Sequence, residues 1–104
     1  MENKRLTVEI FPLAAKDLED IFKYISVDLC NRSAALKLIE DFEQAFDRVS
    51  LFPESYALIK NEHVKDKTLR KIVVKDYLVF YRVKNDSIQV IRVVYGMRDY
   101  ESFL

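Results

Sequence analysis

The sequence predicts an α+β domain in which an antiparallel helical hairpin packs on one face of a small, mostly antiparallel sheet. Three observations lead to this fold class. A short apolar alternation near the start is typical of a strand, two long stretches with apolar residues at steps of three and four are typical of amphipathic helices, and three alternating stretches near the end are typical of strands. The predicted order is strand, helix, helix, strand, strand, strand, which closes into one two-layer unit.

Length and composition indicate one compact domain over residues 1–104, because two smaller pieces could not each bury an adequate core. Half of the residues are hydrophobic and a third are charged, with a single glycine. No apolar run has the length of a signal peptide or a membrane span, so we expect a cytoplasmic protein without a membrane partner. One cysteine, Cys30, cannot form an internal disulfide, which fits a reducing compartment.

The first strand is predicted over residues 6–11, where β-branched and aromatic residues alternate with polar ones. Pro12 ends it and suits the first turn of a helix, which the apolar spacing extends to about residue 29. Ser33 is the expected N-cap of a second helix that ends before Pro53. Because the connection between the helices is short, we expect an antiparallel hairpin.

Residues 54–68 lack periodicity and are expected to form a surface connection, with a short strand or turn near residues 56–59. His63 lies there among charged residues. We expect it to be exposed, because no partners at metal-ligand spacing lie nearby. The sequence therefore predicts neither a metal ion nor a cofactor.

The last three strands are separated by turns at Lys75-Asp76 and Asn85-Asp86, and they are expected over residues 69–75, 77–84 and 87–96. A two-residue turn at Asn85-Asp86 would pair Phe80 with Ile91 and Leu78 with Val93.

The two faces of this hairpin differ in composition. We expect the face with Leu78, Phe80, Ile91 and Val93 to lie against the helices, because it is the cleaner apolar set. The other face would then carry Tyr77, Val79, Tyr81 and Arg92 without a cover. An uncovered apolar and aromatic face usually binds a partner. Alternatively, Arg92 simply lies over the two tyrosine rings.

Charge is distributed unevenly along the chain. Residues 1–63 hold 8 Lys/Arg against 12 Asp/Glu, a net charge of −4, whereas residues 64–104 hold 9 against 5, a net charge of +4. The basic C-terminal half points to an anionic partner. The alternative is that strand ends and turns simply carry more lysine here. Arg82 is expected near the rim of the core, paired with an acidic residue, in a structural role.

Three stretches, "PLAAKDLEDIFKYI", the "FP" after the second helix and above all "YLVFYRVKNDSIQVIRVVYGMRD", resemble the RelE/ParE superfamily of toxins from bacterial type II toxin–antitoxin modules. The resemblance covers nearly the whole chain. It implies the fold deduced above and a growth-arresting toxin that a cognate antitoxin neutralises in a toxin–antitoxin hetero-oligomer. Antitoxins of this family typically wrap the toxin with an amphipathic segment, so Tyr77, Tyr81 and Arg92 are expected to bind it.

The family divides into an enzymatic and a non-enzymatic branch. RelE-like members cut messenger RNA on the ribosome, and ParE-like members act on DNA gyrase without a hydrolytic site. Metal-independent RNA cleavage needs Lys or Arg for the phosphate charge and a further side chain for proton transfer. In the RelE-like branch the resemblance implies catalytic roles for Arg98, Arg70 and Tyr95. In either branch the target or RNA is expected to contact a basic set: Arg98, Arg70, Lys71, Lys75 and Arg92.

Two departures count against the RelE-like branch. Leu78 follows Tyr77 where RelE carries an arginine, and the C-terminal tyrosine of RelE has no evident match. The "DLEDIFKYI" helix and the "IRVVYGMRD" string look closer to ParE. We therefore expect gyrase inhibition, with a ribosome-dependent mRNA endonuclease as the first alternative and a non-toxic binding relic of the same fold as the second.

Overall fold

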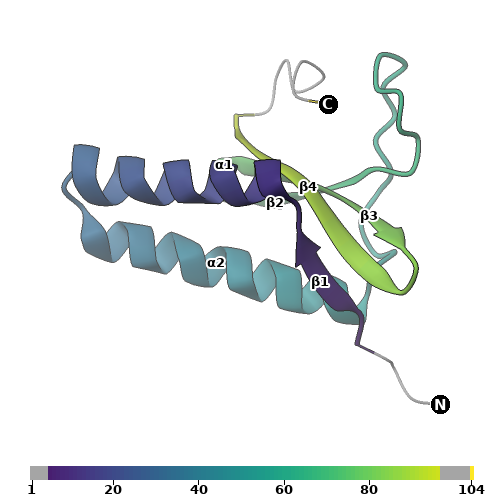
Figure 1. Cartoon of the computed structure of the whole chain (residues 1–104), viewed down its shortest axis with the longest axis horizontal. Coiled ribbons are helices and arrows are strands. Elements are labelled where there is room, and N and C mark those ends of the chain that lie inside the picture. Colours follow the sequence, from purple (N-terminus) through teal and green to yellow (C-terminus); the bar gives the residue numbers. More distant parts are fainter. Residues whose placement is uncertain (1–4, 97–103) are drawn as a thin grey trace.

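The computed structural model describes residues 5–96 and 104, and it has the predicted α+β element order (Figure 1). Its elements are β1 (Thr7–Ile10), α1 (Pro12–Lys23), the π-helical turn η1 (Tyr24–Asp28), α2 (Arg32–Leu51), β2 (Arg70–Val74), β3 (Tyr77–Lys84) and β4 (Ser87–Tyr95).

The strands form one sheet in the order β1-β4-β3-β2. β4 pairs antiparallel with β3, and β3 antiparallel with β2, whereas β1 lies parallel to β4. The long connection that a parallel pair requires consists here of the helical hairpin, the segment after it, β2 and β3. The prediction of a mostly antiparallel sheet is confirmed.

The first helix is shorter than predicted. Pro12 opens α1 as expected, but regular α-helix ends at Lys23 and η1 follows. In η1 the amide of Leu29 donates to the carbonyl of Tyr24, five residues back, and Cys30 then reverses the chain with a φ of 51°. The prediction of a helix to residue 29 is wrong in its last turn, because apolar spacing does not separate a π turn from an α turn.

The N-cap of α2 is Asn31, so the prediction of Ser33 is wrong. The Asn31 Oδ1 accepts a hydrogen bond from the amide of Ala34 at 3.1 Å, three residues on, which is the geometry of an N-cap. Ser33 lies inside the first turn, and its hydroxyl donates to the same Asn31 oxygen.

The β3–β4 hairpin turns at Asn85 and Asp86 as predicted. Both have a positive φ, 53° and 60°, which a two-residue turn matching the strand twist requires. The register next to the turn is also as expected, with Arg82 opposite Gln89. A β-bulge then follows, so Phe80 pairs with Arg92 rather than Ile91.

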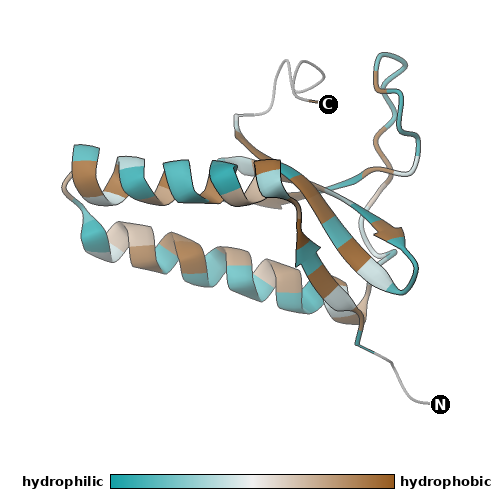
Figure 2. Ribbon diagram, viewed as in Figure 1, coloured by the Kyte–Doolittle hydropathy of each residue, from teal (hydrophilic) through white to brown (hydrophobic). Residues whose placement is uncertain are grey.

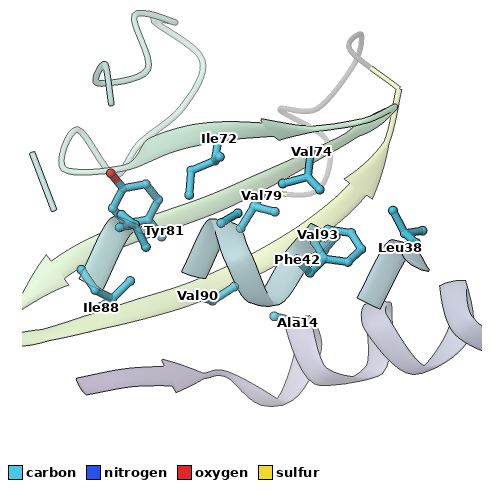
Figure 3. Close-up of a cluster of buried hydrophobic side chains, with 12 residues drawn as sticks. Ala14, Leu38, Phe42, Ile72, Val74, Val79, Tyr81, Ile88, Val90 and Val93 are labelled. Atoms are coloured by element: carbon cyan, nitrogen blue, oxygen red, sulfur yellow. The ribbon is translucent and has the colours of Figure 1, made fainter. Parts of the chain in front are cut away.

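The prediction of which sheet face meets the helices is wrong. Tyr81 and Val79, expected to be bare, are fully buried in the cluster beneath the helices, whereas Phe80 and Leu78 belong to a second cluster on the opposite face. The bulge places Val93 in the helix-facing cluster, as expected. Ile91, expected on the same face, packs against the outer cluster instead. Figure 3 shows that cluster, formed with side chains of both helices: Ala14, Leu38, Phe42, Ile72, Val74, Val79, Tyr81, Ile88, Val90 and Val93.

The segment between α2 and β2 explains this outcome. Residues 54–69 are here called the strap. Residues 54–68 were expected to form a surface connection, but three side chains of the strap cover the outer face of the sheet. Ile59, Val64 and Leu69 are almost fully buried against Leu78 and Phe80. The sheet is thus covered on both faces, so two equally apolar sets were to be expected.

Candidate functional site

Arg70 opens β2 and is turned toward the base of the strap. It pairs with Tyr81 on β3, and its guanidinium donates a hydrogen bond to the backbone carbonyl of Tyr56. The side chain is half-buried. The Arg70 guanidinium is therefore partly used in a hydrogen bond to the strap.

Lys75 and Tyr95 lie at the other end of the strands. Lys75 forms the β2–β3 turn with Asp76, with a φ of 53°, and the amide of Gly96 donates to the Asp76 carbonyl at 2.8 Å. Tyr95 is 73% exposed, and its ring lies edge-on to Tyr77 with centroids 5.3 Å apart. A basic and a phenolic side chain therefore share this end of the sheet.

The proposed catalytic residues do not form one compact group in the part of the chain that the structure describes. Arg70 lies opposite Tyr81 and Tyr95 lies opposite Tyr77, four residues apart along β3. At the rise of a β-strand this separation is about 13 Å. Arg98 lies outside the described residues.

Arg92 forms a partly buried ion pair with Asp17 of α1. The Nε and Nη2 atoms of Arg92 each donate to a different Asp17 oxygen at 2.8 Å, and the amide of Val93 donates to Asp17 as well, at 2.9 Å. Their side chains are only 18% and 14% exposed. Hydrogen bonding to Asp17 raises the pKa of Arg92 above its usual value. The pair connects α1 to the bulged part of β4, a structural role that Arg92 has whatever else it binds.

Tyr81 and Tyr77 differ in what they offer to a partner. Tyr81 has no exposed surface, its hydroxyl donates to the carbonyl of Pro53 at 2.8 Å, and burial raises its pKa to about 12. This burial argues against the predicted role of Tyr81 in antitoxin binding. Tyr77 is half-buried. Its pKa is raised, mainly by burial and to a lesser degree by the neighbouring Tyr95.

Tyr77 and Tyr95 also line a hollow that the sequence did not reveal. It lies beside the end of the helical hairpin, has a volume of about 670 Å³, and is completed by Tyr24, Ile25 and Leu29. Sequence reasoning missed it because Tyr24 and Leu29 were assigned to regular helix. Both are more than half exposed in and after η1.

A second hollow follows the groove between α1 and α2. Its volume is about 350 Å³, and its lining is almost wholly apolar, with Phe22, Ile39 and Phe46 among the lining residues and Glu19 and Glu43 also present. Figure 2 shows hydrophobic stretches along both helices. The sequence could have indicated this hollow, because the apolar stripe of each helix is wider than packing against the sheet alone requires.

Neither a cluster of metal ligands nor a membrane-spanning helix is found among residues 5–96 and 104. No three His, Cys, Asp or Glu side chains in this part gather where they could hold a metal ion. Nor does any helix there have the length and apolar character needed to cross a membrane. His63 is exposed, as predicted.

Comparison with known proteins gives a family match. A family model described as "ParE toxin of type II toxin-antitoxin system, parDE" matches residues 8–100. No curated protein is similar enough to the chain to count as a match.

Solved structures with a similar fold include chains of two toxin–antitoxin systems. A chain of the chromosomal ParDE toxin–antitoxin system from P. aeruginosa superposes with a TM-score of 0.72 at 22% identity, covering 90% of this chain and 99% of that one. A chain of the RelBE2 toxin–antitoxin complex from Mycobacterium tuberculosis gives a TM-score of 0.58 at 15% identity, covering 88% and 98%.

Proposed function

The chain belongs to the family of ParE toxins of type II toxin–antitoxin systems, and from that premise we propose that it arrests growth by binding DNA gyrase in the cytoplasm. In this proposal it acts as a protein-binding inhibitor and needs neither a metal ion nor a cofactor. A cognate antitoxin neutralises it.

One observation carries the choice of a non-enzymatic mechanism. Arg70 and Tyr95, which would supply phosphate binding and proton transfer in an endonuclease, are separated by four residues along β3, about 13 Å. Proton transfer and charge stabilisation on one phosphate require groups within hydrogen-bond reach of the same atoms. Basic side chains spread along a surface instead suit an acidic protein surface.

The basic residues proposed to contact gyrase are Arg98, Arg70, Lys71 and Lys75. Arg98 is the first to test, because the family resemblance assigns a functional arginine to this position in the sequence. We expect Arg98→Ala to abolish growth arrest when the chain is expressed without an antitoxin. Circular dichroism and the thermal unfolding midpoint of the purified variant should match the parent. A fully toxic Arg98→Ala variant would remove this residue from the target-binding set.

The antitoxin is proposed to use the apolar hollows around the hairpin, together with Tyr77. Amphipathic segments bind such grooves through apolar side chains at helical spacing. The two structural relatives come from toxin–antitoxin systems, which supports an antitoxin partner for this chain. Co-expression with the protein encoded by the adjacent gene should restore growth and yield a hetero-oligomer on size-exclusion chromatography. If no such gene lies next to this one in the genome, that would count against this part of the proposal.

A ribosome-dependent mRNA endonuclease is the second candidate, and one observation favours it. Lys75 and Tyr95 share one end of the sheet. In the endonuclease reading these two side chains would act together with Arg98, two residues after Gly96 in the sequence, in phosphate binding and proton transfer. Programmed ribosomes incubated with the purified chain and messenger RNA, with 5′ ends mapped by primer extension, test this reading. Cleavage by the parent that Tyr95→Phe and Arg98→Ala both lose would support the endonuclease over gyrase inhibition.

A further inference from the structure

The groove between α1 and α2 has a buried floor and half-buried walls. Ala35, Leu38 and Phe42 of α2 form the floor and are almost fully buried. The apolar side chains of the walls are half-buried: Leu18, Ile21 and Phe22 of α1, and Ile39 and Phe46 of α2. A partner that enters the groove would therefore meet an apolar surface that the fold leaves partly open to water.

Two of the wall residues take no part in the cores of the described chain. Leu18, Ile21 and Phe46 pack against the helix-facing cluster, whereas Phe22 and Ile39 belong to neither apolar cluster formed by the described residues. Large apolar side chains that the core does not use, grouped at one hollow, indicate a binding surface. Phe22 and Ile39 are therefore the groove residues that we expect to gain most from a partner.

The shape of the groove suits a helix. The two helices lie side by side (Figure 1), and the 12 residues of α1 give the groove a length of about 18 Å. Its wall residues recur at steps of three and four along each helix, so a third helix with the same apolar spacing can pack between the two rows. An extended segment would leave its backbone groups unpaired there, because α1 and α2 already use theirs internally.

The charged residues that line the groove are both acidic. Glu19 lies on α1 and Glu43 on α2, and both are exposed. Neither carboxylate forms a hydrogen bond or an ion pair with any of residues 5–96 or with residue 104. Lys16, one turn before Glu19, pairs instead with Asp20 at 2.7 Å. Each wall of the groove thus presents a negative charge that is available to a partner.

The acidic character continues into the hollows at the two ends of the groove. The hollow beside Tyr77 and Tyr95 shares Ile21 with the groove, and Asp20 is the charged residue among its described lining residues. A hollow of about 620 Å³ beside β1 shares Glu43 and Phe46 with the groove.

This second end hollow holds one basic side chain. Arg5 lines it together with Asp47, and the Arg5 guanidinium is already bonded to the Asp47 carboxylate and to the Ser50 hydroxyl. Of the described residues that line the groove and its two end hollows, Arg5 alone is basic. The whole path across the hairpin is therefore apolar with an acidic rim.

We propose that an amphipathic helix of the antitoxin binds this groove, and that Glu19 and Glu43 select a helix whose apolar side chains are flanked by lysine or arginine. That the helix belongs to the antitoxin rests on the proposed function, whereas the preference for a basic helix does not. Opposite charges at the rim favour the right partner, and like charges exclude a wrong one. The hairpin of a second copy of this chain fits poorly, because it would bring the same acidic rim against Glu19 and Glu43.

The first test uses the full chain and two synthetic helical peptides. Both peptides carry leucine at the same helical spacing, and they differ only beside the leucines, with lysine in one and glutamate in the other. Fluorescence anisotropy should show about tenfold tighter binding of the lysine peptide at low salt, and a smaller difference at high salt, because exposed charges are screened. Equal affinities, or no binding of the lysine peptide, would overturn the proposal.

Variants of the chain locate the preference in the groove. Changing both Glu19 and Glu43 to lysine should reverse it, whereas Glu62→Lys should leave it unchanged, because Glu62 is a 90% exposed side chain of the strap. Ile39→Ala should weaken the binding of both peptides severalfold. Leu36→Ala is its control, because Leu36 is 46% exposed on the same helix and does not line the groove.

The substituted side chains are all at least partly exposed, so each variant should keep the thermal unfolding midpoint of the parent. A folded double variant that still prefers the lysine peptide would overturn the selection by Glu19 and Glu43. Equal weakening by Ile39→Ala and Leu36→Ala would overturn the placement of the helix in this groove.

The protein encoded by the adjacent gene separates this inference from the proposed function. It should bind the parent chain about tenfold more tightly than the double variant with lysine at positions 19 and 43. Equal affinity for both would overturn the charge selection and leave the antitoxin partnership intact. No binding to the parent would contradict the antitoxin part of the proposed function, while the peptide data still decide the preference of the groove. A parent chain that loses affinity for the lysine peptide as it dimerises would show that a second copy is the occupant.

Discussion

At the scale of single residues, Tyr81 shows how one hydroxyl joins the core to the chain just after α2. The ring is fully buried beneath the helices, and the hydroxyl reaches the carbonyl of Pro53. Tyr81→Phe would leave that carbonyl without this donor at a part-buried position. We expect the free energy of unfolding to fall by about 1–2 kcal/mol, measured by urea denaturation at unchanged m-value. Tyr95→Phe is the control, because Tyr95 is largely exposed and should unfold at the parent midpoint. Equal midpoints for both variants would contradict the structural role of Tyr81.

Asp66 gives the protein a pH-dependent contribution to stability. Burial works to raise its pKa, but hydrogen bonds from Thr68 and the Arg82 guanidinium outweigh burial and hold the pKa of Asp66 below its ordinary value. A carboxyl whose pKa is lowered by folding stabilises the protein above its unfolded-state pKa of about 4, and the stabilisation is lost as the pH falls through the folded-state pKa.

The corresponding measurement is stability against pH for the parent and Asp66→Asn. At pH 7 the variant should be less stable by about 1 kcal/mol or less, since the ion pair is partly exposed. The difference should stay constant down to about pH 5 and shrink below pH 4, where the parent carboxylate takes up its proton. A difference that does not change between pH 7 and pH 3 would show that the carboxylate charge is not the source of the stabilisation.

At the scale of elements, the Asp17–Arg92 ion pair connects α1 to β4. Asp17→Ala leaves the Arg92 guanidinium and the Val93 amide without their shared partner in a mostly buried place. We expect a loss of about 3 kcal/mol in the free energy of unfolding. Arg92→Leu in the Asp17→Ala background should recover part of that loss, because it removes the charge that Asp17 neutralised. Additive losses in this double-mutant cycle would mean that the two side chains do not act together.

Element prediction succeeded where the local signal was complete. Pro12 marks the start of α1, and Asn85-Asp86 marks a turn whose two positive φ angles suit those residue types. It failed at the η1 turn and at the cap of α2, where Asn31 and Ser33 are both good caps by residue type and the structure has Asn31. Residue propensity alone does not separate the two.

At the scale of the whole molecule, the two sheet faces could not be assigned from the sequence. The strap covers the outer face with Ile59, Val64 and Leu69, whose spacing of five residues matches neither a helix nor a strand. The bulge beside Phe80 further shifts which β4 residues lie on each face. The candidate site was less predictable than the fold for the same reason: Tyr81 was expected on an open face and is instead buried.

The central claim is that this molecule arrests growth by binding gyrase. The most direct measurement is the supercoiling of relaxed plasmid by purified gyrase over a titration of the chain, with Arg98→Ala in parallel. We predict concentration-dependent inhibition by the parent chain and none by Arg98→Ala at the same concentrations. Full supercoiling at every concentration of a folded parent chain would contradict the claim and leave the endonuclease as the better reading of the basic surface.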